Sequence, residues 1–562
     1  MNTKTHKLFL SVGLIFIINA CDPQPTDFVT PANYYNNIEQ LSYALNGVYN
    51  TLGSYGLYQY TYLCQIGTEA DEGFYNRSTM TQGPQVYNFT SSNQQVQVVW
   101  QNLYIGIENA NLLLENINKA KDIDEQKRGA IKGQALFLRA YYYFLLAINW
   151  GDVPLILTST KSANYEKTQR TPVKDIYEQI VKDMTEAEGL VDSAEDTGFG
   201  GRVSKSVVQG ILARVCLHMA GEPVKDVSKF EDAKKWAEKV INSGFHELEP
   251  NYEQIFKNYA QDKYNVKESI WEVEFWGNAT DSYREYGHVG NVLGISAPRD
   301  SPFGSSTALI NVTYYHYLKY DEGDLRRDWN CAPYRYDRNT TNKIYWGPSH
   351  LYNRNVGKYR REFETLLPKL SYGTPQNFPL LRYSDVLLMY AEAENELNNE
   401  PTTAAYDAVK LVRDRAYGNL LPDAVYNSAA NIPSGLTQEE FREFIREERT
   451  KELCFEALRK YDLIRWGIFL PTMQEVAEHF DENAPAAWIW GALAFKNVEK
   501  NTCYSPYPFM THHCTVIWDK MMAGKALFNT YLRQQIYIFY NKCLWKIKTK
   551  AFKSRLENSS HH

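Results

Sequence analysis

Residues 125–149 read EQKRGAIKGQALFLRAYYYFLLAIN, and this stretch predicts a long helix. The stretch runs into Trp150-Gly151-Asp152-Val153-Pro154, where glycine and proline stop a helix and turn the chain extended. Just before it, residues 98–119 carry an apolar stripe along one helix face, formed by Leu103, Ile107, Ala110, Leu114 and Ile117. Two helices with a short connection form an αα-hairpin. The hairpin is therefore the unit from which we expect this fold to be built.

Further helical patterns continue outward from this hairpin. They lie at 172–191, 203–220, 229–243, 380–397, 402–417 and 437–467. Neighbouring patterns form pairs of roughly tetratricopeptide length, and stacked hairpins of this kind build a superhelical scaffold. Residues 245–379 differ, because helix periodicity fades there and Gly, Pro, Asn, Asp and Tyr dominate around a strand-like piece at 269–276. We predict a mostly α fold: a tetratricopeptide-like helical-hairpin superhelix at about 34–243 and 380–480, with a large irregular, loop-rich ligand-binding region at about 245–379 and a few short strands.

The composition is globular, with many aromatic residues. The 562 residues include 60 Lys and Arg against 66 Asp and Glu, a net charge of -6, and 14% of the chain is aromatic. No Lys/Arg-rich stripe occurs in residues 1–500, which argues against a nucleic-acid partner because phosphate binding needs clustered cations. Nucleotide-binding, metalloprotease, serine-hydrolase and calcium-loop motifs are absent. The motifs therefore give no catalytic residue, no cofactor and no metal ligand, and we assign none.

The N-terminus reads as an export signal. Lys4 and Lys7 form a basic start, residues 8–18 are apolar, and Asn19-Ala20 precedes Cys21. A cysteine after a small residue at this place is typical of lipoproteins, in which it carries the lipid. We predict a signal peptide at 1–20, lipidation of Cys21 and a polar tether at 21–33; the alternative is plain secretion with a structural Cys21. Acyl chains would hold the protein on a membrane without a spanning helix.

Aromatic residues crowd the irregular region and alternate with Asp, Asn and Arg, including Asp324, Arg326, Asn330, Arg335 and Asp337. Flat rings stack on the apolar faces of sugars while polar neighbours bond hydroxyls, so this composition favours a carbohydrate site. The alternative is that the rings build a core where regular structure is sparse. Residues 55–77 are also rich in tyrosine and charge. From these two stretches the candidate ligand-binding residues are Tyr75, Tyr283, Tyr286, Trp329, Tyr334, Tyr336, Tyr345 and Trp346.

Five segments, in order along the chain, resemble the SusD/RagB family of outer-membrane glycan-uptake lipoproteins. They are WQNLYIGIENAN (100–111), GQALFLRAYYYF (133–144) with GDVPL (151–155), GRVSKS (201–206), RYSDVLLMYAEA (382–393), and EERTKELCFE (447–456) running into YDLIRWG (461–467). The resemblance implies a lipid-anchored outer-membrane protein that faces the cell exterior. It also implies binding of oligosaccharides without catalysis, and delivery to a partner SusC-like TonB-dependent transporter. Family members carry an acidic residue beside the ligand site at the place of TEADE (68–72), which adds Asp71 and Arg77 as candidates.

Three other functions stay open at this point. Some members of the family capture peptides, and the aromatic residues could line a groove for a peptide. A surface tetratricopeptide-like adaptor without a small ligand would also need this scaffold. A hydrolase is the third, because Glu272 and Glu274 alternate on a predicted strand and could form a glycosidase-like pair. The simpler interpretation of these two residues is the solvated face of an edge strand.

Charged residues are also expected inside the scaffold. In 437–467 the apolar stripe of Phe441 and Ile445 next falls on Glu448 and Arg449, so these charges should enter the interior as hydrogen-bonded pairs. An architectural role is likewise predicted for Arg139, Arg202, Arg382, Asp385 and Asp462. Cys216 and Cys454 lie in helical patterns without a C-x-x-C partner and should be buried free thiols.

The last 62 residues differ from the rest of the chain. Residues 501–562 hold nine Lys and Arg against two Asp and Glu. Members of the family end with a Phe-Pro-Ile-Pro-like segment, and permitted codons for residues 500–510, read two bases later, encode that segment. We interpret 501–562 as a frameshifted tail after a SusD-like domain at 34–500; the alternative is a genuine basic extension. Sequencing the DNA across codon 500 distinguishes the two.

Overall fold

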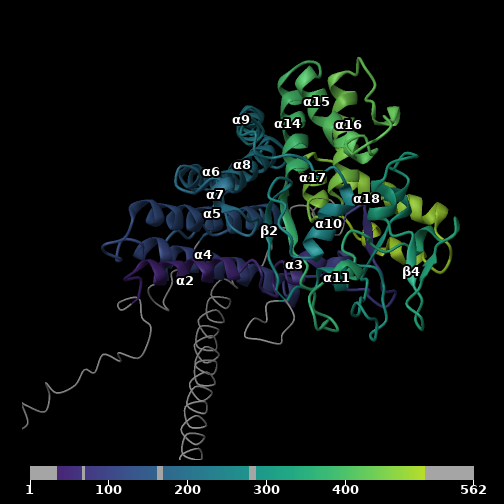
Figure 1. Ribbon diagram of the computed structural model, residues 1–562, viewed down its shortest axis with the longest axis horizontal. Helices are drawn as coiled ribbons and strands as arrows, with labels where there is room; N and C mark the ends of the chain where they lie inside the picture. Colours follow the sequence, from purple (N-terminus) through teal and green to yellow (C-terminus); the bar gives the residue numbers. More distant parts are fainter. Residues whose placement is uncertain (1–33, 66–69, 161–168, 277–285, 500–562) are drawn as a thin grey trace, which may run out of the picture.

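The computed structural model describes residues 34–65, 70–160, 169–276 and 286–499 (Figure 1). The predictions for the signal peptide, Cys21 and the tether, for Tyr283, and for the tail at 501–562 lie outside these residues. No helix within the described ranges combines the length and the apolar character that a bilayer crossing requires.

The first part of the chain forms antiparallel helices that pack one on the next. The long helices are α2 (Ile38–Asn50), α4 (Gln94–Asn116), α5 (Glu125–Trp150), α6 (Val173–Glu188), α8 (Lys205–Ala220) and α9 (Lys229–Asn242), with short α3 (Thr61–Gln65) and α7 (Ala194–Thr197) between them. The hairpin predicted from the sequence is α4 with α5. The Asp124 side chain caps α5 by accepting a hydrogen bond from the Lys127 amide, and Gly151, at φ 67°, ends the helix. Figure 1 shows α2, α4 and α5 lying side by side.

The scaffold continues after the irregular region with α14 (Tyr383–Leu397), α15 (Thr403–Ala416), α16 (Gln438–Leu453), α17 (Arg459–Arg465), α18 (Phe469–Asn483) and α19 (Leu493–Lys496). Helix α9 packs against α8 on one side and against α14 on the other, so two parts of the chain about 140 residues apart form one helical stack (Figure 1). The prediction of a mostly α, hairpin-built fold is confirmed.

Two predicted helix boundaries were wrong. Residues 437–467 form two helices, because the chain breaks between α16 and α17, where Phe455 and Ala457 adopt positive φ angles of 59° and 58°. The pattern at 380–397 begins as strand β6 (Phe378–Arg382), which runs directly into α14. In both cases a buried tertiary contact overrides a periodicity that suits a helix.

The irregular region contains one helix of moderate length, α10 (Tyr252–Ala260), and several short elements. These are β2 (Ser269–Val273), α11 (Val289–Val292), β3 (Ile310–Val312), α12 (Tyr314–Tyr317), α13 (Arg326–Asn330), β4 (Tyr334–Tyr336) and β5 (Lys343–Tyr345). Three antiparallel strand pairs organise it: β4 with β5, β2 with β6, and β3 with β1 (Gly73–Tyr75) from the early part of the chain. The β1–β3 pair therefore brings the tyrosine-rich stretch at 55–77 to the edge of the irregular region.

The predicted interior charges are confirmed. Glu448 and Arg449 are both buried; Arg449 pairs with Asp385 and Asp462, and Glu448 pairs with Arg326 and Arg413. One turn further on, Glu452 binds the guanidinium groups of three arginines.

Asp324, Arg326 and Asn330 were grouped with the hydroxyl-binding residues from composition alone, but all three are buried and join this network. Their bonds to other protein groups leave them structural roles. Cys216 and Cys454 are buried free thiols, as predicted.

Candidate functional site: an aromatic cavity at the β4–β5 hairpin

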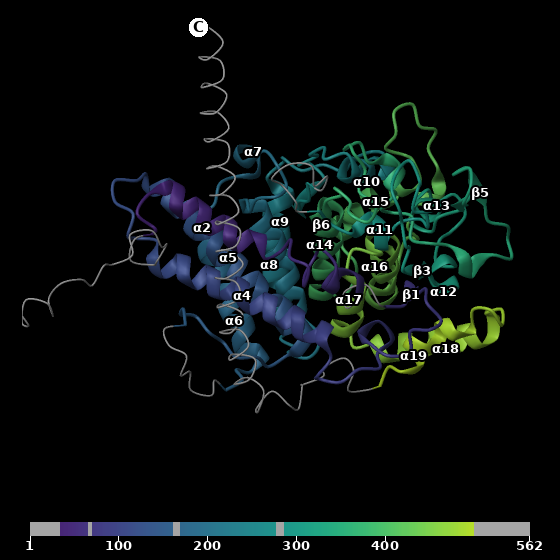
Figure 2. The same ribbon diagram turned by 90° about the horizontal axis from the view of Figure 1, so that it is seen from below.

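A cavity of about 750 Å³ opens beside the β4–β5 hairpin, at the end of the molecule where Figure 2 shows β1, β3 and β5 together. Its wall comes from three distant parts of the chain: the residue after β1, the irregular region, and the residue before η5 (Ile489–Ala492). The size lies within the range typical of small-molecule sites in proteins. The chain thus builds a preformed site from segments that are far apart in sequence.

Asparagine amides form the floor of the cavity. Asn311, on β3 and almost fully buried, accepts hydrogen bonds at its Oδ1 from Asn76 (2.9 Å) and from Asn355 (2.7 Å). Its own amide donates to the Tyr352 carbonyl at 2.9 Å. Asn339 and Asn353 add two further amides to the lining. A fixed row of amides offers both donors and acceptors, which is what a ligand with many hydroxyls requires.

Aromatic rings form the walls. Tyr336 on β4 packs against Phe303 with ring centroids 4.5 Å apart, which fixes the tyrosine ring. Trp346 follows β5, and its main-chain amide donates to the Pro333 carbonyl at 2.8 Å, so the hairpin itself positions the indole. Trp488 also lines the cavity and contacts the ring of Phe74, with ring centroids 5.9 Å apart. Tyr336 is 5% exposed, whereas Trp346 and Trp488 are partly exposed, and such rings beside amides form a surface on which a flat apolar face can stack.

Of the predicted residues, Tyr336 and Trp346 line the cavity, and Tyr75 and Arg77 flank the lining residue Asn76. Arg77 does not face a ligand, because its guanidinium group donates to two main-chain carbonyls, those of Asn76 and Thr307. It therefore holds the end of β1 in place. The structure brings the two predicted stretches together, but mainly through residues next to those expected.

The other candidates lie elsewhere. Asp71 is fully buried and its carboxylate binds Arg459 through two hydrogen bonds of 2.8 Å. Burial by itself would raise the pKa of Asp71, but the charge of Arg459 outweighs it and lowers this pKa. Trp329 is 2% exposed, with the Arg360 guanidinium 3.9 Å above its ring. These placements do not suit ligand contact.

Three tyrosines complete the set of predicted residues. Tyr334 is 3% exposed and its hydroxyl donates to Glu362 at 2.6 Å. Tyr345 pairs with Tyr334 across the hairpin and is 67% exposed, so it is accessible but lies outside the cavity lining. Tyr286 lies beside His288, with ring centroids 5.5 Å apart, away from the lining.

Sequence reasoning missed Asn76, Asn311, Asn355 and Trp488. Asn76 lies more than 200 residues before Asn311 and Asn355, and the pairing of β1 with β3 brings it to them. Trp488 lies between α18 and α19, in a stretch without a recognisable motif. The signal that could have indicated Asn76 is its position directly after the tyrosine-rich stretch.

Comparison with known proteins was consistent with this fold. One family model, described as the SusD family, matches residues 219–512, and a second, described as starch-binding and associating with the outer membrane, matches residues 26–217. The chain belongs to the SusD/RagB family.

Similar proteins include other SusD-like chains. SusD-like protein P2 of Formosa agariphila is 27% identical over 514 residues, which cover 85% of this chain and 95% of that protein. The crystal structure of a SusD homolog from Bacteroides thetaiotaomicron superposes with a TM-score of 0.77 at 30% identity, covering 84% of this chain and 94% of that one. A laminarin-binding SusD-like protein has the same fold, with a TM-score of 0.62 at 22% identity over 82% and 97% of the two chains.

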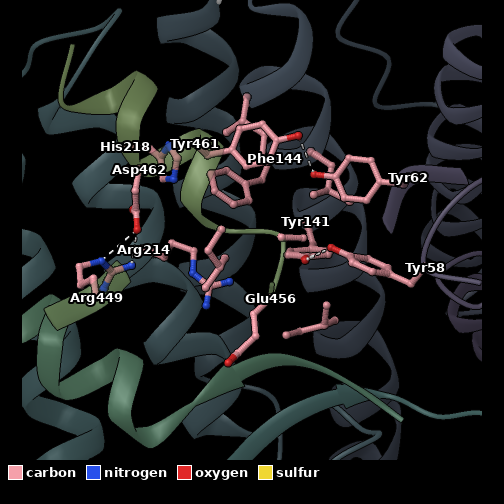
Figure 3. A pocket seen from close by; sticks show the side chains of 15 residues that line it. Tyr58, Tyr62, Tyr141, Phe144, Arg214, His218, Arg449, Glu456, Tyr461 and Asp462 are labelled. Carbon is pink, nitrogen blue, oxygen red and sulfur yellow. Dashed lines mark hydrogen bonds and ion pairs between the residues drawn. The ribbon is translucent and has the colours of Figure 1, made fainter. Parts of the chain in front are cut away.

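A second hollow lies inside the scaffold of this SusD-family chain and has a different character (Figure 3). Its volume is about 30 Å³, which is room for about one water molecule. Tyr58 and Tyr141 share a hydrogen bond of 2.6 Å at its edge, and Asp462 accepts from Arg449 at 3.0 Å (Figure 3). Burial first, and then the charge of Arg465, lower the pKa of His218 to about 3, so this imidazole stays neutral. The hollow belongs to the polar core and cannot hold a sugar.

The two carboxylates considered for hydrolysis, Glu272 and Glu274, differ in burial in this SusD-family structure. Strand β2 ends at Val273 and is irregular in register, so Glu272 is buried while Glu274 is exposed. The interpretation of both residues as a solvated face was therefore wrong for Glu272, whose carboxyl accepts a hydrogen bond from Ser269 at 3.1 Å. Burial first, and then the charge of Glu274, raise the pKa of Glu272 to about 8. Neither residue lines the cavity.

Replacing Glu272 with glutamine should stabilise this SusD-family protein at alkaline pH. A carboxyl whose folded pKa is raised favours folding below its unfolded pKa near 4.5, and this contribution is lost as the pH rises through about 8. The stability difference between Glu272→Gln and the wild type should therefore shift in favour of the variant by about 2 to 3 kcal/mol from about pH 6 to about pH 9. Urea unfolding at both pH values measures this shift. A constant difference would show that Glu272 is ionised throughout the range.

Proposed function

We propose that the protein binds an oligosaccharide in the β4–β5 cavity and does not transform it. The observation that carries this proposal is the combination of three fixed rings, Tyr336, Trp346 and Trp488, with a row of asparagine amides in one preformed cavity. Sugar rings present apolar C–H faces to aromatic rings and hydroxyls to amides, so both surfaces of the cavity match the same ligand. The laminarin-binding relative supports the same class of ligand.

The number of carboxylates at the cavity supports binding without catalysis. Glycoside hydrolysis in most families uses two carboxyl groups on opposite sides of the scissile bond. Among the described residues that line the cavity, Asp337 is the one carboxylate. Its Oδ1 accepts hydrogen bonds from the Asn339 and Thr340 amides, both at 2.9 Å, so the carboxylate stabilises its own turn.

Delivery to a SusC-like TonB-dependent transporter completes the proposal. The protein would be attached through a lipid on Cys21 to the outer membrane, facing the cell exterior. Membership of the SusD/RagB family and the description of the N-terminal family match support this location. Purification of the tagged protein from its own membranes, followed by mass spectrometry, should recover the transporter, and recovery of the protein alone would argue against a stable complex.

Affinity electrophoresis of the purified protein against a panel of polysaccharides tests the binding function, with calorimetry of a peptide mixture alongside. We expect slowed migration with one class of glycan and no heat with peptides. Heat with peptides alone would assign the protein to the peptide-capturing members of the family. No slowed migration with glycans and no heat with peptides would favour an adaptor that binds no small ligand.

A further inference from the structure

Two arginines, Arg335 and Arg338, line the β4–β5 cavity. Arg335 is half-buried on β4, and Arg338 is exposed at the rim. Neither guanidinium group forms a hydrogen bond or an ion pair with another residue in the described part of the chain. The Trp346 ring lies close, with its centroid 5.6 Å from the guanidinium carbon of Arg335, and the charge of Arg335 also acts on the Asp337 carboxylate. The guanidinium donors of both arginines are therefore available to a ligand in the cavity.

Elsewhere this protein pairs its arginines closely. Arg139 forms two hydrogen bonds with Asp183, of 2.8 and 3.0 Å, and Arg382 contacts Glu268, Glu452 and Glu456. Even Arg354, which is 8% exposed, has Asp328 at 3.4 Å. Against this background the free guanidinium of Arg335 marks the cavity wall as different from the rest of the interior.

The carboxylate nearest in sequence, Asp337, carries one negative charge against the two positive charges. Hydrogen bonds from the Thr340 and Asn339 amides and, after them, the charge of Arg335 lower the pKa of Asp337 and keep it ionised, but the hydrogen bonds also commit one of its oxygens to the turn. Two positive side chains and one negative side chain therefore line the cavity. Its charged lining has an excess of positive charge, although the whole chain has a net charge of -6.

Resting on the proposed function, we infer that the ligand is an acidic oligosaccharide, whose carboxylate or sulfate groups bind Arg335 and Arg338. The planar guanidinium group presents two parallel N–H donors that match either kind of anion. Trp346, next to Arg335, would stack on the ring that carries the charged group. The Trp346 indole N–H is buried and lacks an acceptor among the described residues, so it supplies one more donor to an anionic ligand.

Calorimetry with matched ligand pairs tests this inference. One pair is a short oligogalacturonate and its methyl ester, which differ in the carboxylate charge. The other is a short sulfated galactan and its desulfated form. We expect the acidic member of at least one pair to bind about tenfold or more tightly than its neutral partner, and to lose affinity at high salt. The pair that responds identifies carboxylate or sulfate as the recognised group.

Alanine variants of the two arginines test which side chain binds the charged group of the ligand. Arg335→Ala should weaken binding of the acidic ligand by about 10-fold to 100-fold, as expected for loss of a charge-assisted hydrogen bond, and Arg338→Ala should weaken it by a smaller factor. Lys182→Ala removes the same charge from an exposed position on α6, at the far end of the molecule in Figure 1, and should bind as the wild type does. Because Arg338 is exposed, its variant remains informative if Arg335→Ala fails to fold.

The outcomes separate this inference from the function on which it rests. Equal or tighter binding of the neutral members would overturn the acidic ligand while leaving oligosaccharide binding in place. An equal loss of acidic and neutral ligand in Arg335→Ala would also overturn it, since the arginine would then contribute packing rather than charge. If no glycan of any charge binds, the proposed function fails and the inference fails with it.

Discussion

Replacing Glu452 with alanine should lower the free energy of unfolding by about 3 to 5 kcal/mol or more, the largest effect we expect from a single substitution. Glu452 is fully buried on α16, and its carboxylate lies 2.7 Å from Arg415, 2.8 Å from Arg382 and 3.2 Å from Arg326. All three arginine side chains are buried as well. Removing the shared anion would leave three buried cations in partly uncompensated positions.

The pKa of Glu452 has the direction that this argument requires. Burial by itself would raise the pKa, but the guanidinium charges, that of Arg415 first, outweigh burial and hold it well below its ordinary value. A carboxyl whose folded pKa is depressed contributes stability above its unfolded pKa near 4.5, and this contribution is lost as the pH falls toward the folded pKa. The Glu452→Ala defect should therefore be full at neutral pH and shrink in acid.

Urea unfolding followed by circular dichroism measures this effect. Glu443→Ala is a matched control, because Glu443 lies on the same helix and pairs with Arg446, but its side chain is 54% exposed. Such surface pairs contribute about 0 to 1 kcal/mol, so the control should unfold almost as the wild type does. A similar small loss in both variants would show that water or neighbouring carboxylates replace Glu452 among the arginines.

The helical scaffold could be predicted because its pattern is local. The stripe along residues 98–119 determines α4, and the glycine at 151 determines the end of α5, each within a few turns of chain. The break at 454–458 could not be predicted, since the positive φ angles of Phe455 and Ala457 accompany buried tertiary contacts. The burial of charge could also be predicted from the sequence. Glu448 and Arg449 occupy the helix positions on which the apolar stripe of Phe441 and Ile445 falls next.

For the cavity, the sequence predicted the types of residue and the region, but not which residues line it. Aromatic crowding indicated the region in which most of the cavity lining lies, but packing decides which rings are accessible, and packing is not periodic in loops. Trp329 and Trp346 look alike in sequence, yet Arg360 and neighbouring rings bury the first, while the β5 hairpin holds the second at the cavity wall. The amide row depends on the pairing of β1 with β3, which brings together residues more than 200 positions apart.

This difference between two tryptophans leads to the second large effect. Replacing Trp346 with alanine should weaken oligosaccharide binding by about 10-fold to 100-fold, because the variant loses a stacking ring and the apolar area that the ring buries on the ligand. The fold should survive, since the indole is half-exposed and the main-chain hydrogen bond from residue 346 to the Pro333 carbonyl does not need the side chain. Adding Trp488→Ala, which removes another lining ring, should weaken binding further.

Two control variants separate binding from folding. Trp276→Ala removes a ring that is 45% exposed but lies outside the cavity, and it should bind glycan as the wild type does. Trp329→Ala should do the reverse of Trp346→Ala: it should cost about 3 to 5 kcal/mol of stability, as buried tryptophans do, while the molecules that remain folded retain their affinity. Calorimetry together with thermal unfolding measures both quantities for each protein. If Trp276→Ala lost affinity and Trp346→Ala did not, the ligand would bind on the surface near the end of β2, and the cavity would not be its site.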